Sequence, residues 1–148
     1  MRRILPLVAV LFAAAFVTSL FFASAPHAAA AKKHRILMEW TEADTVGQWA
    51  MTKHVGNLLD DMGADNVQLE VLAYGAATFA SSASRPQTLQ AKAIEDLSKR
   101  GVVFHVCHHS MDLLGVKDAE LQPSITPVKG AMWYITTKYN EGWQILRP

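Results

Sequence analysis

Apolar and polar positions follow two periods along this chain, and their succession predicts strands that alternate with helices. The apolar runs at 34–40, 67–74 and 102–107 are typical of buried parallel strands, which are nearly continuous in apolar residues. Between them, 46–62 and 88–99 carry apolar residues at helical spacing. Strands that alternate with helices predict a parallel sheet with helices on both faces.

Turn and cap residues mark where these elements begin and end. The loop 42–45 offers N-cap residues to the first helix, and Gly63 is placed to end it. A last helix is predicted over 130–140, although its β-branched run lowers its helix propensity, and a final strand over 143–147. The other predicted pieces are a long loop or short irregular helix over 76–87, a short helix over 110–114, a turn over 117–122 and an extended piece over 124–126.

The first 31 residues are predicted to be a signal peptide. A short basic start precedes an uncharged apolar run over 4–22 and small residues over 23–31 that fit an A-x-A cleavage signal. The alternative is an uncleaved membrane anchor, because the run is close to the roughly 20 residues that a span needs. Pro6 and the alanine-rich end favour cleavage. We therefore expect one mature domain, residues 32–148, in the periplasm or secreted, without stable membrane association.

Removing this leader changes the charge of the protein. The full chain has 14 Lys and Arg against 13 Asp and Glu, and Arg2 and Arg3 lie in the leader, so the net charge falls from +1 to about −1. No basic patch is evident, and nucleic acid is therefore not an expected partner. The chain also has no dinucleotide fingerprint, kinase motif or Ser-His-Asp order. No cofactor is predicted.

The single cysteine, Cys107, ends the third predicted strand and is followed by His108, His109 and Ser110. One cysteine cannot form an intramolecular disulfide, so in an oxidising compartment it suggests a reactive group or intermolecular pairing. Open α/β sheets place their chemistry at the carboxyl ends of strands. Imidazoles and backbone N–H groups favour the thiolate, which is the reactive form, and we assign this role to His108. The alternative is a buried structural thiol.

The strand order decides which residues share an edge with Cys107. A flavodoxin-like order, 2-1-3-4-5, makes the first and third strands neighbours. That order would place Trp40 and Thr41 beside Cys107, with Tyr74 and Gly75 one strand away. The predicted substrate-binding residues are Trp40, Thr41, Tyr74, Gly75, His109 and Ser110.

Four segments of the chain resemble the DsrE/DsrF-like family of sulfur-relay proteins, particularly its small exported members. They are Gly-Asn-Leu-Leu-Asp at 56–60, Leu-Glu-Val-Leu-Ala-Tyr-Gly at 69–75, Gly-Val-Val-Phe-His-Val-Cys at 101–107 and Glu-Gly-Trp-Gln-Ile-Leu-Arg-Pro at 141–148. The resemblance implies a five-stranded, mostly parallel α/β sheet, assembled as a trimer or hexamer. It also implies persulfide sulfur carried on the cysteine matching Cys107. The chain departs from many exported relatives after that cysteine, where they have asparagine and threonine.

Together these features predict a sulfur-relay protein that carries persulfide sulfur on Cys107, as a sulfurtransferase or a carrier. Its partner would be a sulfur donor or acceptor protein, or a small sulfur compound. One alternative is a copper or zinc site, because imidazole and thiolate suit both metals and four such side chains lie within 105–109. Their spacing is not a standard zinc pattern, so no metal ligand is assigned. A further alternative is an accessory or binding module without turnover.

Overall fold

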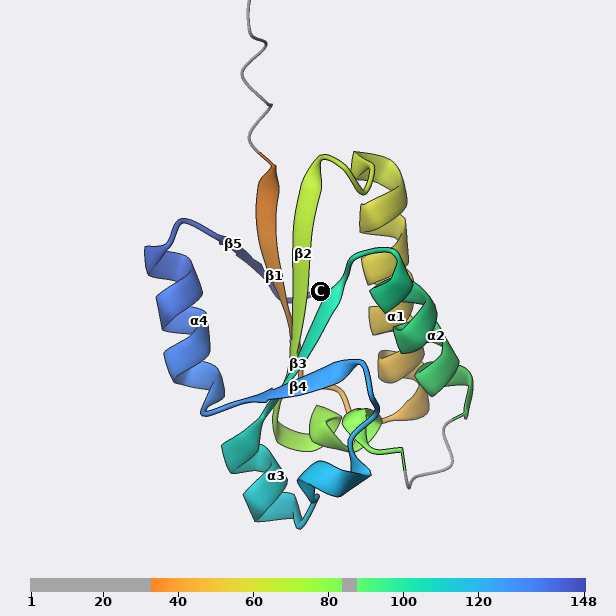
Figure 1. The fold of residues 1–148 in the computed structure, drawn as a ribbon, viewed down its shortest axis with the longest axis vertical. Helices are drawn as coiled ribbons and strands as arrows, with labels where there is room; N and C mark the ends of the chain where they lie inside the picture. Colours follow the sequence, from red (N-terminus) through yellow and green to blue (C-terminus); the bar gives the residue numbers. More distant parts are fainter. Residues whose placement is uncertain (1–32, 84–87) are drawn as a thin grey trace, which may run out of the picture. The chain divides into compact units, whose positions relative to one another are not determined.

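Five parallel strands form the centre of the molecule, in the order β4-β3-β2-β1-β5. The computed structural model describes residues 33–83 and 88–148 (Figure 1), so the predicted signal peptide lies outside the described residues. The strands are β1 (His34–Trp40), β2 (Val67–Ala73), β3 (Val103–Cys107), β4 (Ile125–Val128) and β5 (Gln144–Leu146).

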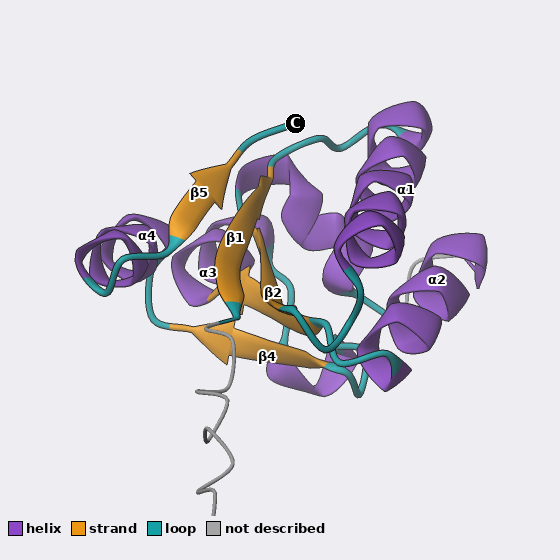
Figure 2. Cartoon of the chain, turned by 90° about the horizontal axis from the view of Figure 1, so that it is seen from above, coloured by secondary structure: helices purple, strands orange, loops and turns teal. Residues whose placement is uncertain are grey.

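Helices cover both faces of this sheet, which confirms the predicted fold class. Figure 2 shows α1 and α2 on one side of the strands and α4 on the other. None of the helices within the described ranges is long and apolar enough to cross a membrane. The helices are α1 (Thr45–Met62), α2 (Thr88–Lys99), α3 (His108–Leu114) and α4 (Ala131–Asn140), with short 3₁₀ helices η1 (Gly75–Ser81) and η2 (Asp118–Glu120).

The predicted strand order is wrong in one respect that bears on the site. β2 pairs with both β1 and β3, so the first and third strands are not neighbours. The chain moves outward from β1 to β4 and then returns through α4 to place β5 on the free side of β1. The crossover from β1 to β2 and the crossover from β4 to β5 run in opposite directions across the sheet. Because such crossovers are right-handed, their helices, α1 and α4, lie on opposite faces. Hydrophobic periodicity marks a strand but says nothing of which strand lies beside it.

The larger core lies between the sheet and the helices α1 and α2. Alternate residues of β1 and β2 point into it, among them Trp40 and Val71, and Phe104 and Val106 do so from β3. Met51, Val55 and Leu59 meet them from α1, and Ile94 and Leu97 from α2. This burial agrees with the helical spacing from which both helices are predicted.

The opposite face of the sheet carries a smaller core, and Cys107 belongs to it. The buried members of this cluster are Leu37, Leu72, Cys107, Ala131 and Trp143. Other strand residues on this face are ionisable, among them Glu70 on β2 and His105 on β3. The sheet therefore has one apolar face and one face on which apolar and ionisable side chains are mixed.

Candidate functional site

Cys107 is the last residue of β3, at the carboxyl edge of the sheet, as predicted. It is only 4% exposed. Its sulfur accepts a hydrogen bond from the backbone N–H of Ala131, the first residue of α4, at 3.3 Å. The thiol is thus placed at the start of a ten-residue helix, where unpaired N–H groups and the helix dipole favour a negative charge. The thiol is therefore closed off from solvent in this arrangement.

The predicted substrate residues of β1 and β2 are split between the two faces of the sheet. Tyr74 follows β2 and packs against the cluster that contains Cys107. Its hydroxyl donates to Glu39 at 2.8 Å, and burial together with this hydrogen bond raises the pKa of Tyr74 to about 12. Trp40 is buried in the larger core on the other face, so the sheet separates it from the sulfur. The prediction that Trp40 lies in one crevice with Cys107 rested on the wrong strand order.

Thr41 lies near the end of the chain rather than beside Cys107. Its hydroxyl contacts Glu42 at 3.0 Å and accepts a hydrogen bond from Arg147 at 3.1 Å. From β1 the chain builds the sheet in one direction to β4, and it then returns to add β5 on the other side of β1. The topological switch point is therefore between β1 and β5, where Thr41 and Arg147 meet, and not between β1 and β3 as we expected. The structure therefore separates the switch point from the thiol.

The three residues after Cys107 begin α3 and point to different neighbours. The two ring nitrogens of His108 face Asp112 at 3.3 Å and Asp118 at 3.7 Å. Ser110 accepts a hydrogen bond from the backbone N–H of Gly75 at 3.0 Å, which ties the end of β2 to α3 and brings these two predicted residues together. The role assigned to His108 at the thiolate stays a prediction.

His109 lies beside the chain segment that covers the thiol. A hollow of about 410 Å³ is lined by His109, Lys129, Gly130 and Trp133. The His109 ring is so close to Gly130 that a Cβ there would lie 3.1 Å from Nδ1. A larger hollow of about 480 Å³ lies between α1 and α2, but it contains none of the predicted site residues. The smaller hollow is therefore the better candidate for a ligand site near Cys107, because it is lined by residues next to the segment that covers the thiol.

A buried cluster of four ionisable side chains lies on the same face of the sheet as Cys107. Glu70 of β2 accepts hydrogen bonds from the Tyr134 hydroxyl at 2.6 Å and from Lys138 Nζ at 2.7 Å. His105 Nε2 lies 3.0 Å from the same hydroxyl. Because that hydroxyl gives its single proton to Glu70, His105 Nε2 is the donor in this contact, and the same Nε2 also lies 3.4 Å from Glu70 Oε2.

These contacts set the electrostatics of the cluster. Burial alone raises the pKa of Glu70, but the hydrogen bonds from His105, Lys138 and Tyr134 outweigh it and lower the pKa to about 2. Burial and the neighbouring carboxylate raise the pKa of Tyr134. Glu70 is therefore a buried anion at neutral pH, with Lys138 as its partner. Removing one member of such a buried pair strongly destabilises the fold, because the other charge is left without a partner.

Sequence reasoning did not identify this cluster. One signal was present: Glu70 is a charged residue inside an otherwise buried strand, and buried charges are almost always paired. Tyr134 and Lys138 are one helical turn apart on α4, a spacing that puts them on one helix face. What the sequence could not show is that this helix face meets β2.

The predicted alternative of a Cys/His metal site finds no matching geometry. Within residues 33–83 and 88–148, no three His, Cys, Asp or Glu side chains are arranged to hold a metal ion together. His105 faces Glu70, His108 faces Asp112, and Cys107 faces the Ala131 N–H. Three of the four side chains at 105–109 therefore have separate partners.

Solved structures show what this chain is similar to. No family model matches it, and no curated protein matches it. The protein of unknown function MTH1491 from Methanobacterium thermoautotrophicum superposes with a TM-score of 0.72 at 22% identity, covering 78% of this chain and 100% of that one. The ychN protein from E. coli gives a TM-score of 0.66 at 13% identity, covering 78% and 99%.

A third match has the same architecture. The protein of unknown function BT1422 from Bacteroides thetaiotaomicron gives a TM-score of 0.57 at 15% identity, covering 77% of this chain and 94% of that one. At these identities the matches show the fold alone. The chain therefore has the α/β fold of these solved structures, built on a five-stranded, all-parallel sheet.

Proposed function

We propose that this protein relays sulfur as a persulfide on Cys107. The observation that supports the proposal most directly is the hydrogen bond from the Ala131 N–H to the Cys107 sulfur at 3.3 Å, at the carboxyl edge of a parallel sheet. A backbone donor at a helix start favours an anion, and both the thiolate and the persulfide are anions. The DsrE/YchN-like fold is consistent with this function.

The proposed chemistry needs no external oxidant. The Cys107 thiolate attacks the outer sulfur of thiosulfate, a new S–S bond forms, and sulfite leaves with the electron pair of the broken bond. In the second transfer, a thiolate on the acceptor attacks the outer sulfur of the persulfide, and Cys107 leaves as a thiolate. Because the chain contains one cysteine, the acceptor thiol belongs to another molecule.

The burial of Cys107 fits a carrier that must protect its cargo. A persulfide enclosed by apolar side chains is shielded from water and from oxidants, whose attack depends on exposure. Ala131 lies directly against the sulfur, and Cys107 belongs to the smaller apolar cluster of the sheet. Loading and unloading then require that part of this enclosure moves.

The decisive experiment is intact mass spectrometry after incubation with thiosulfate or polysulfide, without reductant. We expect the wild-type protein to gain the mass of one or more sulfur atoms, with release on adding dithiothreitol. Cys107→Ser should gain none while keeping its circular dichroism spectrum, since the two side chains are similar in size. A wild-type protein that stays a bare thiol would contradict the proposal and favour a binding module without turnover.

The proposed part of His108 has its own test. If its imidazole favours the thiolate, His108→Ala should slow iodoacetamide labelling of Cys107 at neutral pH without abolishing it. His54→Ala is the matched control, because His54 is an exposed imidazole on α1, a helix that packs on the other face of the sheet. Equal labelling rates in the two variants would limit His108 to its contacts with Asp112 and Asp118.

Export is also part of the proposal. The basic start, apolar run and small residues of 1–31 motivate it. N-terminal sequencing of the protein from expressing cells should return Ala31 or Lys32, with the protein in the soluble extracytoplasmic fraction. An intact N-terminus in the membrane fraction would instead support the anchor.

A further inference from the structure

A part of the chain that is distant in sequence covers Cys107. Ala131, the first residue of α4, donates its N–H to the sulfur. Sequence proximity does not hold Ala131 there, because it lies 24 residues further along the chain. Something else in the fold must therefore keep the start of α4 in place.

The cluster around Glu70 fixes α4 to the sheet. Tyr134 and Lys138 lie on the same face of α4 as Ala131, three and seven residues further along, and both donate to Glu70. The Nζ of Lys138 also lies 4.0 Å from the centre of the Trp143 ring, a cation–π contact that adds to the attachment at the far end of α4.

The rest of α4 contributes little apolar burial. Ala131 is the only residue of this helix that is fully buried, and Met132, Trp133 and Tyr139 are exposed. Ile135 and Tyr134 are partly buried against the sheet. A helix held by few apolar contacts and by specific polar contacts belongs to the low-stability part of a structure, where local opening occurs.

We propose that Glu70, Tyr134 and Lys138 are positioning residues that latch α4 over Cys107, and that access to the sulfur requires this latch to open. The inference rests on the proposed sulfur relay for its use, because a donor or acceptor must reach a thiol that is 4% exposed. The latch controls access to the thiol, and this access can be measured without any sulfur transfer.

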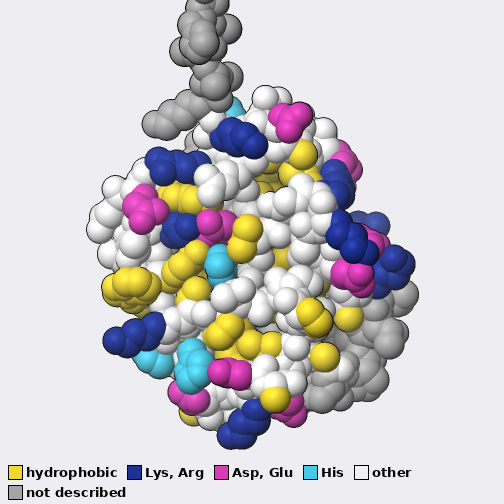
Figure 3. Space-filling view, in the orientation of Figure 1, with side chains coloured by type: hydrophobic (Ala, Val, Ile, Leu, Met, Phe, Trp, Pro, Cys, Tyr) yellow, Lys and Arg dark blue, Asp and Glu magenta, His cyan; other side chains and the backbone are white. Residues whose placement is uncertain are grey.

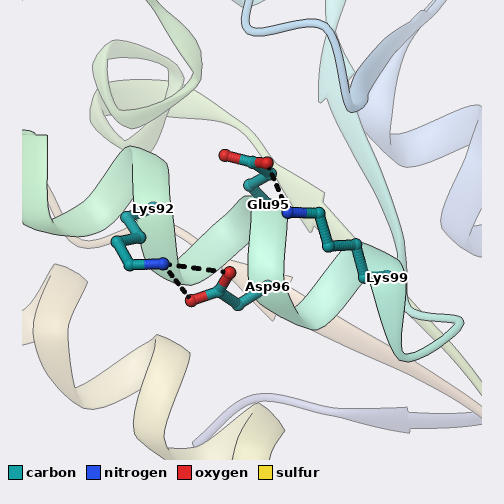
Figure 4. A network of polar contacts seen from close by, with 4 residues as sticks. All are labelled: Lys92, Glu95, Asp96 and Lys99. Atoms are coloured by element: carbon teal, nitrogen blue, oxygen red, sulfur yellow. Dashed lines mark hydrogen bonds and ion pairs between the residues drawn. The ribbon is translucent and has the colours of Figure 1, made fainter.

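The test uses the folded full-length mature chain and two measurements. The first is the rate of iodoacetamide labelling of Cys107, and the second is hydrogen exchange of α4 followed by mass spectrometry. The variants are Tyr134→Phe, which removes the hydroxyl bonded to Glu70, and Lys138→Met, which removes the ammonium. Asp96→Asn is the control, since it breaks the exposed Lys92–Asp96 ion pair of α2, which Figure 4 shows beside Glu95 and Lys99.

We expect both variants to label Cys107 roughly tenfold faster than wild type, because each loses a hydrogen bond that holds the closed arrangement. Faster exchange should be confined to α4 and the segment around Trp143, and Asp96→Asn should behave as wild type. Unchanged labelling in Tyr134→Phe and Lys138→Met would overturn the latch. So would faster exchange spread evenly through β1, β2 and β3, because that outcome is general destabilisation.

Lys138→Met leaves Glu70 without its ammonium partner and risks general unfolding, and in that event Tyr134→Phe decides the matter alone. The outcome also separates the two proposals. If the variants label faster but wild-type protein never gains sulfur from thiosulfate or polysulfide, the sulfur relay falls and the latch stands. If wild-type protein gains sulfur while the variants label at its rate, the relay stands and the latch falls.

Discussion

Glu70 shows how a single residue departs from the pattern of its element. Its neighbours in β2 are apolar and buried, yet its carboxylate is kept ionised by three donors from β3 and α4. Replacing a buried ion pair with apolar residues is often neutral, whereas breaking one leaves an uncompensated charge. The position therefore tolerates very few substitutions made alone.

The pKa of Glu70 leads to a prediction about acid stability. The folded value of about 2 lies below the ordinary value of 4.5, so the carboxylate stabilises the fold above about pH 4.5 and loses this effect as the pH falls toward 2. Glu70→Gln should lower the free energy of unfolding by on the order of 3 kcal/mol at neutral pH. The difference from wild type should shrink across that acid range.

Urea unfolding at neutral and acidic pH, followed by tryptophan fluorescence, measures this difference. Glu95→Gln is the control, because Glu95 forms an exposed ion pair with Lys99, and such pairs contribute little. A wild-type advantage that stays constant down to about pH 3 would show that the charge of Glu70 is not what stabilises the fold.

At the scale of elements, helix α1 shows how local sequence sets a boundary. The Asp44 carboxylate accepts the N–H groups of Val46 at 3.0 Å and Gly47 at 2.9 Å, which satisfies two of the donors left free at a helix start. Gly63 ends the helix with a φ of 78°, a conformation that glycine adopts without strain, and its N–H reaches Leu59. Helix α4, by contrast, has Gly130 at its N-cap position and therefore no side-chain cap.

The cap of α1 gives a second prediction. Hydrogen bonds from Gly47 and Val46 lower the pKa of Asp44, so the ionised carboxylate is the form that caps the helix. Asp44→Ala should lower the Tm by a few degrees at neutral pH. Asp44→Ser, which keeps a capping oxygen, should recover most of the loss in the same calorimetric measurement. Equal losses in the two variants would indicate that the cap is not what Asp44 contributes.

For the whole molecule, the outer surface of α4 stands out. Figure 3 shows hydrophobic side chains gathered on this side of the molecule, and Met132, Trp133 and Tyr139 of α4 are each more than 60% exposed. Exposed apolar patches of this kind mark interaction sites. The mature chain is thus expected to bury part of this surface in an assembly.

We predict that the mature protein is a trimer or hexamer, as the family resemblance implies. Sedimentation velocity at micromolar concentration should show one species larger than a monomer. Trp133→Asp, which puts a charge on the exposed side of α4, should shift the protein toward monomer, whereas Val46→Asp on α1 should not. A wild-type monomer at high micromolar concentration would contradict this prediction.

The amino-acid sequence by itself determined the local structure of this protein. The apolar runs and helical spacings placed β1, β2, β3, α1 and α2 within a few residues of their observed bounds. The same pattern put Cys107 at a strand end, because strand ends and helix starts depend on neighbours a few residues apart. Local periodicity is also sufficient to predict an α/β sheet with helices on both faces.

Only the tertiary structure decided the strand order, and with it the surroundings of Cys107. The donor to its sulfur lies 24 residues away, and the Tyr134 and Lys138 that bind Glu70 lie 64 and 68 residues away from it. No periodic pattern carries information over such separations, because the contacts arise from how α4 crosses the sheet on its return to β5. The chain therefore encodes its elements locally, while the enclosure of the thiol is a property of their packing.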